Sequence, residues 1–185
     1  MPLPPPVARE QLHARRIELR GYRRVDGLYD IEAHMVDTKS DDLTLVGGRV
    51  VPSGEPVHDM SIRLVVDEDL NVMDVFACTD AAPQGICPQA TRTLESLKGH
   101  CIGPGWSKIV RERLAGRKGC THLTELLKPL ATVAFQTLTK VWAKRPTAVD
   151  ANGKPRKIDS CYAYASDREM VLRRWPAYYQ GEEGK

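Results

Sequence analysis

The chain has 185 residues, of which 42% are hydrophobic and 28% charged, and its formal net charge is +3. This length suits one domain that buries a core without disulfides, and the charge is too small and too dispersed to indicate nucleic-acid binding. No apolar run approaches the roughly 18 residues of a membrane span. The five cysteines show no CxxC spacing, and no secretory signal is visible, so we expect reduced thiols in a cytoplasmic protein.

The first half of the chain predicts strands. Residues 1–12 are rich in proline and predict an extended arm, followed by a single domain over 13–185. Residues 15–38 predict two strands around a turn at Val25-Asp26-Gly27, although Tyr22, Tyr29 and His34 leave the register open. Residues 39–56 predict a loop with at most a short strand. Residues 57–79 are the clearest hairpin, because Met60, Ile62, Leu64 and Val66 alternate with more polar positions.

The second half predicts helices. The spacing predicts a helix that starts at Pro88 and ends near Lys98, a second from Trp106 to Leu114, and a third that starts near Cys120 and carries an apolar stripe. The tail predicts a strand over Cys161 to Ala165 and a short helix that ends near Trp175. Strands followed by helices indicate an α+β fold, with an antiparallel sheet and helices packed on one side.

The segment GCTHLTELL, residues 119–127, places three polar side chains at the start of the third helix. A helix N-terminus lowers the pKa of a thiol, so Cys120 is a candidate metal ligand or nucleophile. His122 is a second candidate ligand, and Glu125 lies three residues further along the same helix face, where it could move a proton. The ordinary alternative is a buried cysteine beside two surface residues.

Two further segments add candidates. In VHDM, residues 57–60, His58 shares the face of Met60 by the two-residue period of a strand, whereas Asp59 points away. His58 is a candidate ligand and Asp59 a candidate acid or base; the alternative for His58 is a histidine satisfied by one backbone carbonyl. Asp80 lies in the loop between the hairpin and the first helix, and it is the third candidate for proton transfer.

Three residues are candidates for binding a substrate. Tyr22 and Arg24 belong to the polar cluster GYRRVDG, in which an arginine fork could hold a carboxylate. The commoner alternative for this cluster is a solvated hairpin tip. Trp106, in GPGW, is expected either in the core or in the wall of a pocket.

Most of the chain, from about residue 9 to 176, resembles a bacterial family known only as domain of unknown function 2889. The motifs that carry the resemblance are RGYRRVDGLYDIEAHMVDTK, GEPVHDMSIRL, TDAAPQGICP, IGPGW and GCTHLTELL. The family name implies no activity.

Residues 57–142 also resemble, more weakly, the NifU-like scaffold for iron–sulfur clusters. This resemblance implies a NifU-like core with an extra N-terminal hairpin, and it aligns Cys120 with the last scaffold cysteine and His58 with the first. The middle cysteine of the scaffold would fall near Ala81 or Ala82 and is absent. The chain therefore lacks the three-cysteine set of the scaffold, and we expect instead a corner where His58, Cys120 and His122 meet and could hold zinc or iron.

These observations lead to two hypotheses. The first is a metal-dependent enzyme that performs lyase-type or proton-transfer chemistry on a hydroxylated small molecule, aromatic or acidic, with zinc or iron as its cofactor. The second is a carrier that delivers a metal or sulfur to a partner enzyme. No serine-nucleophile elbow, phosphate loop or dinucleotide fingerprint is present in the sequence. The sequence leaves open whether the protein is a homo-oligomer.

Overall fold

The computed structural model describes residues 3–181. The chain divides into two compact units, residues 1–139 and 140–185. The larger unit contains the sheet and the helices that cover it, and the smaller one, as far as residue 181, contains the end of the last of these helices and three short helical segments. The expectation of a single domain from residue 13 onward remains a prediction.

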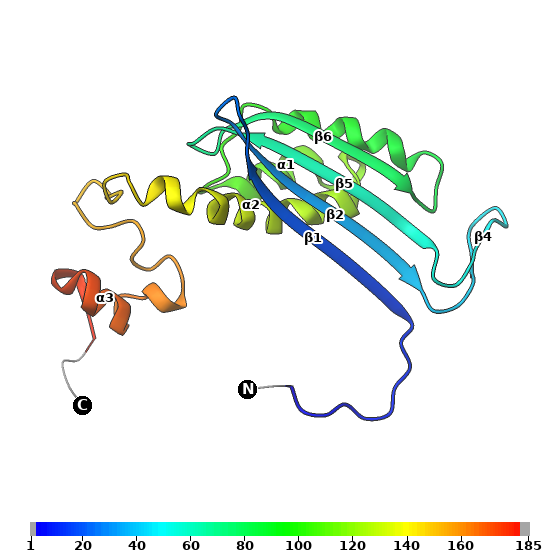
Figure 1. Cartoon of the computed structure of the whole chain (residues 1–185), viewed down its shortest axis with the longest axis horizontal. Helices are drawn as coiled ribbons and strands as arrows, with labels where there is room; N and C mark the ends of the chain where they lie inside the picture. Colours follow the sequence, from blue (N-terminus) through cyan, green and yellow to red (C-terminus); the bar gives the residue numbers. More distant parts are fainter. Residues whose placement is uncertain (1–2, 182–185) are drawn as a thin grey trace. The chain divides into compact units, whose positions relative to one another are not determined.

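The larger unit is built on a four-stranded antiparallel sheet. Its strands are β1 (His13–Arg23), β2 (Tyr29–Lys39), β5 (Pro56–Val66) and β6 (Val72–Ala81), in the order β1-β2-β5-β6. The order of these four strands across the sheet is thus the same as their order along the chain (Figure 1). A second, two-stranded sheet of β3 (Leu43–Thr44) and β4 (Val50–Val51) interrupts the loop between β2 and β5. Both predicted hairpins are confirmed.

The hairpin turns follow from local chemistry. In the first turn Gly27 has φ +87°, and the backbone N–H of Arg24 donates to the carbonyl of Leu28. In the second turn one oxygen of Asp67 accepts from the N–H groups of Asp69 and Asn71, at 2.9 and 2.8 Å. Asp and Gly favour turns because a short carboxylate can cap nearby N–H groups and glycine tolerates positive φ.

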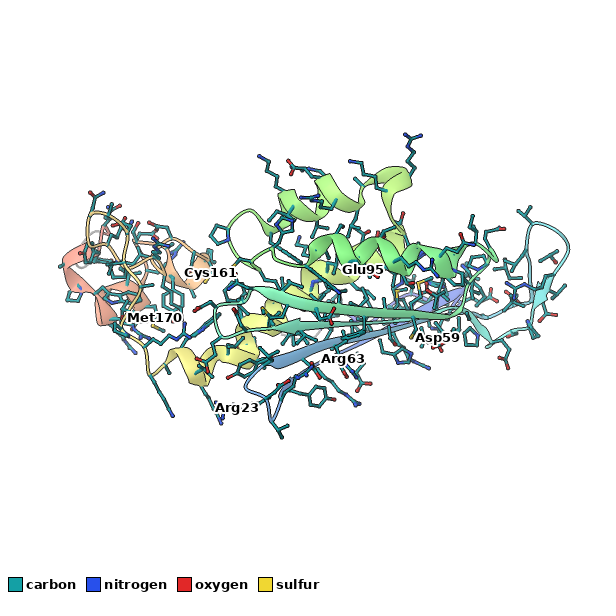
Figure 2. The ribbon with its side chains drawn as sticks, turned by 90° about the horizontal axis from the view of Figure 1, so that it is seen from above. Arg23, Asp59, Arg63, Glu95, Cys161 and Met170 are labelled. Carbon is teal, nitrogen blue, oxygen red and sulfur yellow. The ribbon has the colours of Figure 1, made fainter. Side chains whose placement is uncertain are left out.

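Helices cover one face of the sheet. The segment η1 (Cys87–Leu97) is a 3₁₀ helix, α1 spans Trp106–Leu114, η2 spans Gly116–Lys118, and α2 spans Thr121–Trp142. Figure 2 shows the sheet edge-on, with Glu95 on the helical side and Arg63 and Asp59 on the other. The α+β class with helices on one side is therefore confirmed.

The core lies between the sheet and the helices. Buried side chains of β2 and β5 pack there against leucines of η1 and α2; among the most buried are Ile31, Met35, Met60, Ile62, Leu94, Leu97, Leu123 and Leu127. Each such side chain stabilises the fold by about 1.5–3 kcal/mol relative to exposure. The register also answers the question left by the sequence, because Tyr29 belongs to the inward row and His34 to the outward one.

The helix α2 runs along β1 at very close range. A Cβ atom on Gly21 would overlap the side chain of Thr137. At the other end of the same pair of elements, Arg15 of β1 contacts Glu125 of α2. The first residues of α2 therefore lie beside the start of β1 and the end of β2.

One expectation about local structure was wrong. The segment Cys161 to Ala165 is not a strand but contains the 3₁₀ helix η3 (Tyr162–Tyr164), followed by α3 (Glu169–Arg174) and η4 (Pro176–Tyr178). Among residues 3–181, this segment pairs with no strand. The first predicted helix is confirmed, and it is a 3₁₀ helix in which threonine and serine hydroxyls donate to carbonyls three residues earlier.

Candidate metal centre

Asp37 and His58 face each other across β2 and β5. They are directly paired in the register of the two strands, and both belong to inward rows. His58 has an irregularity on each side: the β2–β5 register shifts after Asp37, and the β5–β6 register shifts between Asp59 and Met60. Bulges of this kind redirect side chains and are common beside functional sites.

His122 reaches the same place from the start of α2. Gly119 precedes the helix and passes so close to α1 that a Cβ there would lie 2.8 Å from the carbonyl oxygen of Leu114. The carbonyl of Cys120 then accepts the first hydrogen bond of the helix, from the N–H of Thr124 at 2.9 Å. One residue into the helix, the ring of His122 lies over that of His58, with centroids 3.8 Å apart and planes tilted by 34°.

Together, Asp37, His58 and His122 form a group that could hold a metal ion. One potential ligand atom from each lies within 4.8 Å of the others. Asp37 is the only charged side chain of residues 3–181 that is fully buried. His58 Nδ1 lies 3.0 Å from Asp37 Oδ2.

Arg15 fixes the carboxylate of Asp37. Its Nε donates to Oδ1 at 2.7 Å and its terminal nitrogen to Oδ2 at 2.8 Å, so the guanidinium grips both oxygens as a fork. His13 adds a longer contact, with Nε2 3.5 Å from Oδ1. The carboxylate is thus held in one orientation, with Oδ2 facing Nδ1 of His58.

The surroundings set the charge state of two of the three groups. Burial by itself would raise the pKa of Asp37, but the hydrogen bonds and charge of Arg15, with the charges of His58 and His13, outweigh burial and lower that pKa. Burial lowers the pKa of His58, and so does His122, against the opposing effect of Asp37. Near neutral pH Asp37 is therefore ionised and His58 neutral, and these are the forms that bind metal ions.

Cys120 lies beside this group but is not part of it. Its Sγ is 3.9 Å from Nδ1 of His122, and its side chain is partly exposed. A sulfur and a nitrogen bound to one tetrahedral zinc ion are about 3.6 Å apart. The predicted ligands His58, His122 and Cys120 are thus gathered in one place, with His122 between the other two.

The residues predicted for proton transfer fall in two places. Glu125 joins the site through Arg15, whose terminal nitrogen donates to Oε2 of Glu125 at 3.2 Å. Asp59 lies on the outer face of the sheet, where its carboxylate is 2.7 Å from Nε2 of His34. Asp80, at the β5–β6 irregularity, accepts from the thiol of Cys78 at 3.7 Å.

The residues predicted for substrate binding lie away from His58. Tyr22 is at the far end of β1, seven residues or about 23 Å along the strand from Arg15. Arg24, in the turn that follows, is paired with Asp26 and Asp30. Trp106 is buried at the start of α1, where its indole N–H donates to the carbonyl of Leu127 at 3.3 Å.

Sequence reasoning missed Asp37, Arg15 and His13. The signal for Asp37 was present, because Ile31, Ala33, Met35 and Asp37 continue one two-residue period, and this places a carboxylate in the inward row. Arg15 and His13 could be found only from the register of β1 with β2, which pairs them with Asp37 and Lys39.

Comparison with known proteins gives one match. A family model described as a protein of unknown function (DUF2889) matches residues 13–136, which include every residue of the metal centre. No curated protein and no solved structure matches the chain. The NifU-like core therefore stays a prediction. Within residues 3–181, no helix has the length and apolar character needed to span a membrane.

Proposed function

Because the chain belongs to the DUF2889 family, whose function is unknown, we propose from its site alone that it is a metal-dependent enzyme. Asp37, His58 and His122 would hold a zinc or iron(II) ion. The reaction would be of lyase or proton-transfer type on a hydroxylated small molecule, aromatic or acidic. The observation that carries the proposal is the convergence of a buried carboxylate and two imidazoles from three separate elements.

The separation of Asp37 and His58 suits two ligands of one ion. Two ligand atoms about 2.1 Å from an ion and at right angles to each other are about 3.0 Å apart. His58 Nδ1 and Asp37 Oδ2 already have this separation, with the ring hydrogen between them. A bound cation would take the place of that proton, and the fork of Arg15 would hold the carboxylate as it does now.

The ligand types point to zinc or iron rather than to calcium or magnesium. Imidazole nitrogens suit zinc and iron, whereas calcium and magnesium prefer oxygen ligands. Two histidines and one carboxylate are a ligand set that leaves coordination positions open for a substrate. When bound, such an ion acts as a Lewis acid on a substrate oxygen, and a hydroxylated substrate would supply that oxygen.

Two side chains at the rim could move protons. The carboxylate of Glu125 is largely exposed and is oriented by Arg15. Cys120 offers a thiol at the N-terminus of α2, next to His122. Both residues lie within three positions of His122 at the start of α2, so a substrate bound to the ion would lie within reach of their side chains.

Elemental analysis of untagged protein, purified under reducing conditions, tests the proposal. Wild type should carry close to one equivalent of zinc or iron, and Asp37→Asn, His58→Ala and His122→Ala should each lose it. His100→Ala is a matched control, because His100 lies in the turn after η1 and outside the group of three. Protein without metal, even after reconstitution with zinc or iron(II), would refute the proposal.

Turnover separates the enzyme from the carrier. The metal-loaded protein should convert members of a panel of hydroxylated aromatic and aliphatic acids, and His58→Ala should abolish this conversion. A protein that binds metal, shows no turnover and passes its metal to an acceptor chelator within minutes would instead be a carrier.

A further inference from the structure

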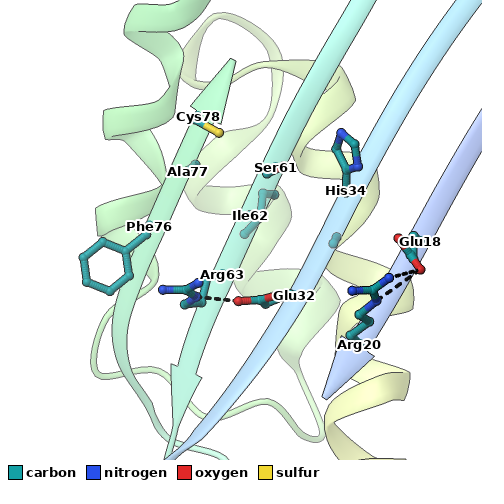
Figure 3. Close-up of a pocket in the computed structure, with 11 residues that line it drawn as sticks. Glu18, Arg20, Glu32, His34, Ser61, Ile62, Arg63, Phe76, Ala77 and Cys78 are labelled. Atoms are coloured by element: carbon teal, nitrogen blue, oxygen red, sulfur yellow. Dashed lines mark hydrogen bonds and ion pairs between the residues drawn. The ribbon is translucent and has the colours of Figure 1, made fainter. Parts of the chain in front are cut away.

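The face of the sheet away from the helices carries ordered rows of charge. On this outer face, the strand register aligns Arg20, Glu32, Arg63 and Phe76 in one row across β1, β2, β5 and β6. The next row is formed by Glu18, His34, Ser61 and Cys78. Both rows line a shallow concavity of about 420 Å³ (Figure 3).

The charges in this concavity are already paired. Arg63 Nε donates to Glu32 at 2.7 Å, and Arg20 contacts Glu18 at 2.5 Å. His34 is held by Asp59 at 2.7 Å. The concavity therefore offers a small ion no unpaired charge of opposite sign. A second surface on which acidic and basic side chains alternate in the same way could form ion pairs with these side chains in place of the pairs within the chain. Phe76, on the edge strand β6, is 53% exposed, so apolar area is available for burial at this end of the row.

We propose that this outer face docks a second copy of the chain through a two-fold axis parallel to the strands. Such a rotation keeps each row opposite the same row of the second copy and reverses the strand order. β1 then lies over β6 of the second copy, and β2 over β5. The arrangement is isologous, since every contact occurs twice.

This symmetry makes the row at Glu32 self-complementary. Glu32 lies opposite Arg63 of the second copy, and Arg63 opposite Glu32 of the second copy. At the ends of the row, Arg20 lies opposite Phe76 of the second copy, which permits a cation–π contact. In the next row, His34 meets Ser61 of the second copy, so no like charges face each other.

If the outer face were buried in full, its area would reach that of a small specific dimer. Four strands about 4.8 Å apart and about ten residues long present about 600 Å² per copy, or about 1,200 Å² in total. This is the lower limit of stable protein–protein interfaces. The strands of two packed sheets cross at about 30°. The two-fold axis allows this angle if the strands of each copy are tilted by about 15° from the axis.

Charge reversal combined with sedimentation equilibrium on the full chain tests the proposal. Wild type should be a dimer. Glu32→Arg places two arginines opposite each other, and Arg63→Glu places two glutamates opposite each other; each should weaken dimerisation at least 10-fold. The double variant E32R/R63E restores both opposed pairs and should dimerise like wild type.

The controls separate folding from docking. Lys108→Glu and Glu112→Arg make the same charge changes in an exposed pair on α1, and both should leave the dimer intact. Circular dichroism should show wild-type helix and strand content for all variants. The measurement is repeated after metal removal, so its result does not depend on the proposed metal centre.

Three results would overturn the proposal. The first is a monomeric wild type. The second is a dimer that neither single reversal weakens, which would place the interface on another surface. The third is a double variant that remains monomeric. This result would indicate a two-fold axis across the strands, which puts Glu32 opposite His34, so that exchanging Glu32 and Arg63 would not restore the opposed pairs.

Discussion

Arg15 and Asp37 form a two-pronged ion pair across the first two strands, with 2.7 Å from Nε to Oδ1 and 2.8 Å from the terminal nitrogen to Oδ2. The pair connects a partly exposed arginine to a buried carboxylate at the edge of the core. It explains how a charged group is tolerated there, because a buried charge persists only when it is paired and hydrogen-bonded. It also orients the carboxylate toward His58.

Replacing the guanidinium group of Arg15 by an ammonium group should weaken metal binding. Arg15→Lys keeps the positive charge but can grip only one oxygen, so the carboxylate gains freedom to rotate. Loss of such an outer partner typically reduces metal affinity about 10–100-fold. A competition titration with a chromophoric zinc chelator measures the change. Arg16→Lys, on the opposite face of β1, should bind zinc like wild type, and equal affinities for both variants would contradict the role given to Arg15.

Removal of the charge on Asp37 should destabilise the metal-free protein. Asp37→Asn keeps the shape of the side chain but leaves Arg15, His58 and His13 without a charged acceptor. The expected loss is about 1–3 kcal/mol of unfolding free energy, since Arg15 is partly exposed. Urea denaturation of chelator-treated protein measures it. An unchanged midpoint would show that the pair contributes nothing to stability.

The approach of α2 to α1 should depend on Gly119. In Gly119→Ala the new methyl group meets the carbonyl of Leu114 at 2.8 Å, so the start of α2 must shift and take His122 with it. We expect a loss of about 1–3 kcal/mol in stability and weaker zinc binding. Gly85→Ala is the matched control, because nothing lies within 4 Å of the position of its Cβ. Calorimetric unfolding and zinc titration of both variants test this, and identical behaviour of the two would contradict it.

Metal loading should protect one cysteine selectively. Cys120 is next to His122, whereas Cys161 is exposed in the smaller unit. Zinc at the site should slow alkylation of Cys120 by iodoacetamide at least several-fold and leave Cys161 unaffected, as read by peptide mass spectrometry. Equal protection of both thiols, or of neither, would mean that Cys120 does not border the ion.

Much of the fold could be predicted because its signals are local. The alternation in β5 placed Met60 and His58 on the inner face, and Val25-Asp26-Gly27 marked the first turn. His122 contacts both His58 and Cys120, as the sequence led us to expect, and the role of the three as ligands stays a prediction. The strand predicted over Cys161 to Ala165 was wrong, because this segment pairs with no other strand and contains the 3₁₀ helix η3 instead.

The rest of the site depends on long-range register. Arg15 and Asp37 are 22 residues apart, and their contact exists only because of how β1 pairs with β2. The two-residue period predicted that Asp59 points away from the face of His58, but it did not identify the partner of Asp59, which is His34 on the neighbouring strand. Tyr22 and Trp106 carried no positional signal, so their placement required the structure.

Isothermal titration of chelator-treated protein with zinc tests the central claim most directly, with wild type, His122→Ala and His100→Ala measured side by side. The account predicts one site per chain in wild type and His100→Ala, and a loss of affinity of at least 100-fold in His122→Ala. If His122→Ala binds zinc as tightly as wild type, or wild type does not bind it, then Asp37, His58 and His122 are not a zinc centre.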